Sequence, residues 1–283
     1  MNTDSPTAAF LSRVPHLPTL YEDELLYSIV ARYGQMTGYL GAESANLDLF
    51  GRSFGHASSR APSALSAMAD RLPAILKISA RDLVTCHTLL PYYYAFFPDD
   101  RREKAIDASL AQNGRADKAA GMDAGPLPTP RNLRFCPACL DAMETANQDL
   151  HWKRVHQLAI VALCPDHGCD LRLSSIAPQP AEKSLHPATR ANCRPDAPTQ
   201  IPPCVEVDRD ALLGLARGAR ALLNGTYPVN APRVKAGELA QLFRDLGYRR
   251  NNRIDWQILQ PEVQKIVAGL VPVMPGLSRA GAR

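Results

Sequence analysis

The 283-residue chain lacks several patterns by which common enzyme classes are recognised. No H-x-E is followed by P-C-x-x-C, so the acid–base glutamate of zinc-dependent deaminases is missing. H-E-x-x-H and a phosphate-binding G-x-x-x-x-G-K-[ST] are also absent. These absences exclude the corresponding metalloprotease, deaminase and nucleotide-hydrolase sites. We therefore expect a protein that is not an enzyme.

Long apolar runs are missing as well. The longest lie near LAIVALC, residues 158–164, and are far shorter than the ~18 residues that a membrane span needs. The first residues show no charged segment followed by an apolar one, so no secretory signal is predicted. We expect a cytoplasmic protein without a membrane partner.

Charge of one sign is not in large excess over the whole chain, which has 32 Lys+Arg against 28 Asp+Glu. The imbalance is nevertheless local. Residues 205–283 carry 12 basic against 7 acidic side chains, whereas residues 1–204 carry 20 against 21. Such an asymmetry is compatible with a C-terminal part that faces phosphate, and equally with an ordinary solvated surface.

Helical periodicity is the most frequent pattern in the sequence. An amphipathic pattern predicts a helix over about 22–36, another over 62–72, a third that Ser79 and Asp82 begin as a capping box, and a fourth capped by Asp99. Residues 111–132 are poor in large apolar groups, and residues 176–204 contain seven prolines, so both are predicted as boundaries. Three more helices follow: one over about 212–222, one ended by Gly247, and one starting near Pro261.

The sequence thus predicts a mainly α protein with a small zinc-ribbon-like α+β element. Its expected domains are a helical, helix-turn-helix-like domain at 15–112, a zinc-ribbon-like domain at 131–175, and a C-terminal three-helix module at 205–272.

Two short elbows, C-P-A-C at 136–139 and C-P-D-H at 164–167, carry the chemistry. Zinc takes four N or S ligands at tetrahedral corners, and each elbow supplies two of them, here Cys136, Cys139, Cys164 and His167. Seven cysteines in a reducing compartment are better explained by metal binding than by disulfides. Four protein ligands leave no open corner, so we expect one structural Zn²⁺.

Alternatives to this ligand set remain open. Cys169 follows the second elbow closely and could replace His167. His151 and His156 lie between the elbows and could be extra ligands, although satisfied core or surface histidines are more common. Cys193 and Cys204 are weak candidates for a second metal site.

The densest basic cluster is YRRNNR, with Arg249, Arg250 and Arg253, which could contact DNA phosphates or bases alongside the two asparagines. A solvated loop would have the same composition. The aromatic run PYYYAFFP, residues 91–98, contains no interleaved basic residue, which favours packing over base stacking.

The segment LRFCPACLDAMETANQDLHWKRVHQLAIVALCPDHGCDL resembles the TnsD/TniQ family of bacterial transposons. Members show R-[FY]-C-P-x-C, W-[KR]-R-x-H-Q-L and C-P-x-H-G-x-x-L, which are similar to residues 134–139, 152–158 and 164–171. Upstream, DELLYSIVARYGQMTG and CHTLLPYYYAFFPDDRREKAIDASL resemble the family's helical opening and its H-T-x-x-P-[YF] block. The likeness extends over about residues 15–173, and beyond them it is loose.

This resemblance implies a target-site selector for DNA transposition, without chemistry of its own, that binds double-stranded DNA and recruits the AAA+ regulator TnsC in a bacterial nucleoid. It implies that the four zinc ligands are Cys136, Cys139, Cys164 and His167. Members of the TnsD branch are usually longer. The resemblance therefore implies either a piece of such a protein or a shorter adaptor whose partners include a transposase or an RNA-guided targeting complex. The alternative hypothesis is a zinc-stabilised helix-turn-helix transcription regulator without a transposition role.

Overall fold

A computed structural model describes most of the chain. The described residues are 14, 16–39, 41–53, 58–112, 114–122, 129–178, 184–201, 206–227, 236–250 and 253–267. No helix among them is long and apolar enough to cross a membrane.

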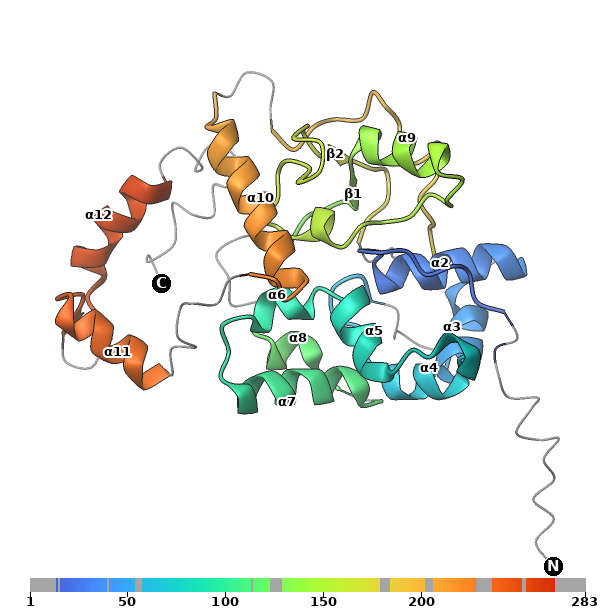
Figure 1. The fold of residues 1–283 in the computed structure, drawn as a ribbon, viewed down its shortest axis with the longest axis horizontal. Coiled ribbons are helices and arrows are strands. Elements are labelled where there is room, and N and C mark those ends of the chain that lie inside the picture. Colours follow the sequence, from blue (N-terminus) through green and yellow to red (C-terminus); the bar gives the residue numbers. More distant parts are fainter. Residues whose placement is uncertain are drawn as a thin grey trace, which may run out of the picture.

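The described residues are mainly helical, as the sequence predicts (Figure 1). The α-helices are α2 (Leu26–Thr37), α3 (Ala42–Phe50), α4 (Leu65–Arg71), α5 (Ala80–His87), α6 (Leu90–Tyr94), α7 (Asp99–Leu110), α8 (Ala116–Ala119), α9 (Pro137–Thr145), α10 (Arg209–Leu223), α11 (Ala236–Asp245) and α12 (Trp256–Val267). Two 3₁₀ turns are η1 (Ala74–Leu76) and η2 (Val155–Gln157). Antiparallel pairs join β1 (Arg134–Phe135) to β2 (Arg172–Leu173) and β3 (Arg249–Arg250) to β4 (Arg253–Ile254).

Helix α2 begins four residues later than the periodicity predicts. Residues 23–25 run antiparallel to residues 152–154, because the amide of Leu25 donates to the Trp152 carbonyl at 2.8 Å and the amide of Arg154 donates to the Asp23 carbonyl at 2.7 Å. Asp23 also has φ of 58°, in the left-handed region that a helix cannot include. A long-range pairing therefore overrides the local preference for helix.

The capping box of α5 is confirmed. The Ser79 hydroxyl accepts the amide of Asp82, and the Asp82 carboxylate accepts the amide of Ser79. Helix α7 differs, because Pro98 is its N-cap residue and Asp99 lies in its first turn without a side-chain cap. The prediction of Asp99 as the cap is therefore wrong, although its charge is still placed where the helix dipole favours an anion.

One apolar core extends from the N-terminal helices through residues 133–171 to α10. Ala216, Ala219 and Leu223 of α10 belong to this core, and Leu212 joins a smaller cluster with Leu163. Figure 1 shows α10 running from the segment with β1, α9 and β2 to α6, and its main contacts are with α6 and η2. The buried stripe of α10 thus ties the metal-binding segment to the N-terminal helices.

The segment expected to be a linker, residues 111–132, contains the short helix α8. Ala116, Ala120 and Met122 are buried there, and α8 contacts α7. Few and mostly small apolar side chains are therefore enough to pack residues 114–122 against the core. Residues 123–128 lie outside the described part of the chain.

The aromatic run is mostly packed. Tyr94 is buried, Tyr92 and Tyr93 lie partly buried against the core, and Phe96 is 60% exposed. The two half-buried tyrosine rings meet edge to face with their centroids 5.3 Å apart.

Helices α11 and α12 flank the β3–β4 hairpin. Gly247 ends the first helix region with φ of 76°, as predicted. Helix α12 begins at Trp256, before the predicted start, and Pro261 lies inside it. Leu242, Leu246 and Trp256 are all more than one-third exposed on this unit.

Candidate metal centre

The first elbow sits where a strand becomes a helix. Strand β1 leads directly into Cys136, which is the N-cap residue of α9, and Pro137 occupies the first helical position, where its missing N–H costs nothing. The Cys136 sulfur accepts the amide of Cys139 at 3.4 Å. One turn of helix therefore turns both thiols toward the same point.

The second elbow is a closed hairpin loop. Leu163 and Asp170 form a β-bridge, the Cys164 amide donates to the Cys169 carbonyl, and the Gly168 amide donates to the Cys164 carbonyl, both at 2.8 Å. Gly168 adopts φ of 65°, where a side chain would be strained. The pairing of β1 with β2 brings this loop beside the first elbow.

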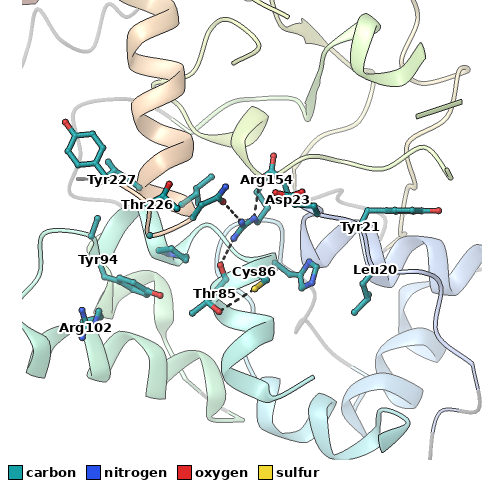
Figure 2. A pocket seen from close by; sticks show the side chains of 18 of the residues that line it. Leu20, Tyr21, Asp23, Thr85, Cys86, Tyr94, Arg102, Arg154, Thr226 and Tyr227 are labelled. Atoms are coloured by element: carbon teal, nitrogen blue, oxygen red, sulfur yellow. Dashed lines mark hydrogen bonds and ion pairs between the residues drawn. The ribbon is translucent and has the colours of Figure 1, made fainter. Parts of the chain in front are cut away.

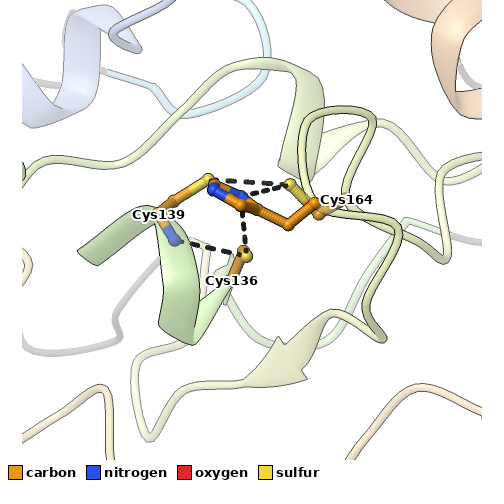
Figure 3. Close-up of side chains that lie close together, drawn as sticks. Cys136, Cys139 and Cys164 are labelled. Atoms are coloured by element: carbon orange, nitrogen blue, oxygen red, sulfur yellow. Dashed lines mark hydrogen bonds between the residues drawn. The ribbon is translucent and has the colours of Figure 1, made fainter. Parts of the chain in front are cut away.

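The structure brings the four predicted ligands together, and Figure 3 shows how the three cysteines lie. One ligand atom from each of Cys136, Cys139, Cys164 and His167 lies within 4.8 Å of all the others. The sulfurs of Cys139 and Cys164 are 3.6 Å apart, and Nδ1 of His167 lies 3.3–3.6 Å from the three sulfurs. Tetrahedral zinc, with bonds of about 2.3 Å to sulfur and about 2.0–2.1 Å to nitrogen, separates its ligand atoms by roughly 3.5–3.8 Å. The spacing therefore fits a zinc ion.

The electrostatics of the cluster also suit a cation. Hydrogen bonds from Cys136 and Cys139 lower the pKa of the Cys164 thiol, whereas those with Cys139 and Cys164 raise the pKa of Cys136. The three buried thiols thus differ in how readily each loses its proton, and the thiolate is the form that binds metal. The Cys136 thiol also stands at the N-terminus of α9, where the helix dipole favours a thiolate.

The alternative ligands are placed differently. His151 and His156 are buried, and neither belongs to the group of mutually close ligand atoms among the described residues. Cys193 is buried and directs its thiol to the side chain of Asn192 at 3.3 Å. Cys204 lies outside the described residues. Cys169 lies outside the group of four as well, but its sulfur is only 3.2 Å from that of Cys136.

The W-K-R-x-H-Q-L motif, residues 152–158, lies between the two elbows and connects the metal-binding segment to the rest of the described chain through hydrogen bonds. Arg154 is buried and donates to the carbonyls of Thr85 and Thr88 at 2.7 and 3.2 Å, to the Asp23 carboxylate at 3.3 Å and to the Asn224 side chain at 3.2 Å. Figure 2 shows this guanidinium at the wall of a pocket of about 810 Å³ between α5, α6 and the end of α10. One side chain thus joins three parts of the chain.

Neighbouring motif residues act in the same way. The Trp152 indole is 1% exposed and donates to the His186 carbonyl at 2.9 Å. The Gln157 side chain both accepts the amide of Arg134 and donates to its carbonyl, so it extends the edge of β1. These residues are structural, because each satisfies buried backbone groups rather than facing solvent.

A bridge of opposite charges connects the second elbow to α10. Asp166 accepts from Lys153 at 2.7 Å and also pairs with Arg220 of α10. Among the four expected ligands His167 is the exposed one, and it lines a pocket of about 430 Å³ together with these three side chains. The histidine corner of the cluster is therefore the one that faces solvent.

The basic residues singled out for DNA lie on the β3–β4 hairpin. Arg250 pairs with Arg253 across the two strands, and both are exposed. Like charges directly opposite each other destabilise a strand pair, and Asp255 contacts Arg250 only at 3.9 Å. Arg249 is half-buried, and Asn251 and Asn252 lie outside the described residues. The arrangement collects positive charge on one hairpin, far along the chain from the metal centre.

Two buried arginines, Arg134 and Arg32, have structural roles that the sequence pattern did not predict. Arg134 is fully buried and donates to the carbonyls of Val161 and Leu158, and Arg32 pairs with the buried Glu24 at 3.0 Å. In the sequence, each of these arginines is a charged residue within an apolar stretch, which was the available indication that it is buried. The partners of these two arginines lie between 8 and 117 residues away, so the sequence pattern could not identify them.

The sequence also contains one G-x-S-x-G, residues 51–55. A nucleophile elbow requires this pattern between a strand and a helix. Here Gly51 instead ends helix α3, with φ of 73°. The part of this pattern that is described therefore lacks the context of a hydrolase nucleophile.

Comparisons with known proteins match the N-terminal part of the chain, including the metal-binding segment. The model of the TniQ family matches residues 15–171, which is more than half of the chain and includes all four clustered residues. The "Transposon Tn7 transposition protein TnsD" of Escherichia coli is 28% identical over 154 residues, which make up 54% of this chain and 30% of that protein. The matched segment is thus less than a third of that relative's length. The family match over residues 15–171 shows that the chain belongs to the TniQ family.

Proposed function

We propose that this protein is a target-site selection adaptor for DNA transposition. The observation that carries the proposal is the family match over residues 15–171, which includes both the cysteine–histidine cluster and the motif that fastens it. The similar relative is described as a transposition protein of a transposon. In this role the chain binds target DNA or a targeting complex and recruits an AAA+ regulator of the TnsC kind.

The metal centre holds one structural Zn²⁺ in this proposal. Cys136, Cys139, Cys164 and His167 fill four tetrahedral corners, so no corner is left for a water molecule or a substrate. The ion links residues that are 25 or more positions apart, which makes the metal-binding segment rigid. Metal-dependent folding of this kind contributes roughly 10–16 kcal/mol in zinc-finger peptides.

The positive hairpin supplies the DNA contact. Arg250 and Arg253 face each other across the two strands, Asp255 comes only within 3.9 Å of Arg250, and a phosphate would relieve the mutual repulsion of the two arginines. Arg249 adds a third cation to the same hairpin. Contacts of this type set affinity rather than sequence preference, so target selection requires further contacts or a partner complex.

The central experiment measures capture of a purified TnsC-like ATPase. We expect the zinc-loaded chain to retain the ATPase and the chelator-treated chain to lose it, because the metal-binding segment unfolds. Elemental analysis in parallel should give one zinc per chain. The matched control is Cys193→Ser, which removes a buried thiol outside the cluster and should leave both the zinc content and the capture unchanged.

The outcomes separate the two functional hypotheses. A footprint on a promoter that does not depend on any ATPase partner, together with no capture of the ATPase, would support the transcription-regulator alternative. Absence of stoichiometric zinc would instead contradict the structural centre itself. Retained capture after complete removal of zinc would show that the partner surface lies elsewhere.

A further inference from the structure

The metal cluster contains a fifth ligating side chain. The sulfur of Cys169 lies 3.2 Å from the sulfur of Cys136. This separation is shorter than the roughly 3.8 Å between two sulfurs on one tetrahedral zinc, so both thiols cannot keep these positions as ligands of the same ion. It fits a hydrogen bond between the two sulfurs, in which either can be the donor. Cys169 is thus placed in contact with the cluster, but outside its four corners.

The four corners are not equally protected. Cys136, Cys139 and Cys164 are buried, whereas His167 is exposed on the loop between residues 164 and 169. The described residues supply no hydrogen-bond partner to Nε2 of this imidazole, although metal-bound histidines usually donate their second ring N–H to a carboxylate or carbonyl. His167 is therefore the least supported corner of the site.

Cys169 shares the short loop that carries His167. The two residues flank Gly168, whose left-handed conformation lets the chain reverse, and the Cys169 carbonyl is fixed by the Cys164 amide at 2.8 Å. Rotation of the Cys169 side chain between staggered rotamers moves its sulfur by about 3 Å without any change in that backbone. The thiol can therefore reach a corner next to its present position.

We propose that Cys169 is a reserve ligand that takes the place of His167 on the metal ion. In this exchange the bond from Nδ1 of His167 to zinc breaks, the Cys169 sulfur forms a new bond, and the thiol proton passes to solvent. The result is a Cys₄ site, which holds structural zinc as well as a Cys₃His site does. The exchange frees the exposed loop at His167 without releasing the ion. This proposal rests on the zinc centre of the proposed function.

The test uses the full chain and its His167→Ala, Cys169→Ser and double variants. Each protein is loaded with Zn²⁺, titrated with a competing chelator, and separately loaded with Co²⁺, whose sulfur-to-metal charge-transfer absorption counts bound thiolates. We expect His167→Ala to keep one equivalent of metal, with charge-transfer absorption about one-third stronger than in the unmodified protein, because four thiolates replace three. The double variant has only three protein ligands. We expect it to bind zinc more weakly than His167→Ala by more than the 10–100-fold that loss of an outer hydrogen-bond partner costs.

A second measurement avoids any variant at a primary ligand. We expect Cys169→Ser to lose zinc to excess chelator faster than the unmodified chain, because the reserve thiol can no longer hold the ion while His167 is dissociated. Cys193→Ser is the matched control and should leave this rate unchanged.

Equal zinc affinity of His167→Ala and the double variant would overturn the proposal, as would a cobalt spectrum of His167→Ala with three thiolates or fewer. An unchanged rate of zinc loss in Cys169→Ser would also contradict it. Each of these results leaves the zinc content and ATPase capture of the unmodified chain untouched. Failure of the reserve ligand is therefore distinguishable from failure of the proposed function.

Discussion

Replacing Arg154 with alanine should destabilise the whole molecule, because this guanidinium satisfies groups from three separate segments. The variant leaves the buried Asp23 carboxylate without its counter-charge and the carbonyls of Thr85 and Thr88 without a donor. Removing one partner of a buried ion pair costs about 3–5 kcal/mol, and each unpaired buried carbonyl costs roughly 1–3 kcal/mol. These contributions overlap, so we expect a loss of about 3–5 kcal/mol in the free energy of unfolding at neutral pH.

The loss of stability in Arg154→Ala should also depend on pH. Burial raises the pKa of Asp23 above its ordinary value even in the presence of Arg154. Without the guanidinium the pKa of Asp23 in the folded state rises further, so the folded protein binds a proton that the unfolded chain does not. The stability of the variant relative to the parent is therefore lowest at neutral pH. This relative stability of the variant increases as the pH falls toward the raised pKa of Asp23.

The assay is chemical denaturation of the zinc-loaded proteins, monitored by tryptophan fluorescence, at pH 7 and pH 5. The matched control is Arg194→Ala, which removes the same kind of ion pair with Asp196, where both side chains are more than two-thirds exposed. This control should change stability by less than about 1 kcal/mol. Adding Asp23→Asn to Arg154→Ala should restore part of the loss at pH 7, since it removes the uncompensated charge. A loss below about 1 kcal/mol for Arg154→Ala would refute the assignment of this residue as the central fastening of the fold.

Further predictions concern DNA, pH and packing. The Arg249→Ala, Arg250→Ala double variant should weaken binding to all DNA sequences and reduce the slope of log K against log salt by up to about two; an unchanged slope would remove the hairpin from the interface. Burial lowers the pKa of His87 to about 4, below the unfolded value of 6.5, so stability should fall as the pH drops from about 6.5 toward 4. His87→Gln should flatten that fall, which unfolding curves at several pH values would reveal, and an equally steep fall would contradict a neutral buried His87. Trp152→Phe removes the hydrogen bond to His186 and part of a buried ring, so we expect a loss of about 2–4 kcal/mol in the free energy of unfolding, and a loss below about 1 kcal/mol would oppose its structural role.

Local chemistry was sufficient for several elements. The spacing of the two elbows predicted which four side chains meet, because a two-residue turn between ligands restricts where both can point. The Ser79–Asp82 box and the left-handed Gly247 were likewise correct, since caps depend on residues within one turn. A mainly helical chain followed from periodicity in the same way. That these residues bind zinc, and that the hairpin arginines contact DNA, stays a prediction.

Errors arose where distant segments compete with local preference. Residues 23–25 have helical periodicity but pair with residues 152–154, and the left-handed Asp23 then delays α2. Pro261 indicated a helix start, yet the helix begins at Trp256 and includes the proline. Each local signal was real. Neither signal contained information about the residues against which the element packs.

The sequence by itself determined the two ligand pairs, one in each elbow, and the helical character of the chain, because both depend on residues within a few positions of one another. Only the tertiary structure decided what the W-K-R-x-H-Q-L stretch, residues 152–158, does. Its buried side chains join the N-terminal helices, the metal-binding segment and α10 through partners up to 131 residues away. Burial makes those hydrogen bonds obligatory, and no pattern along the chain specifies which distant carbonyl or carboxylate will satisfy them.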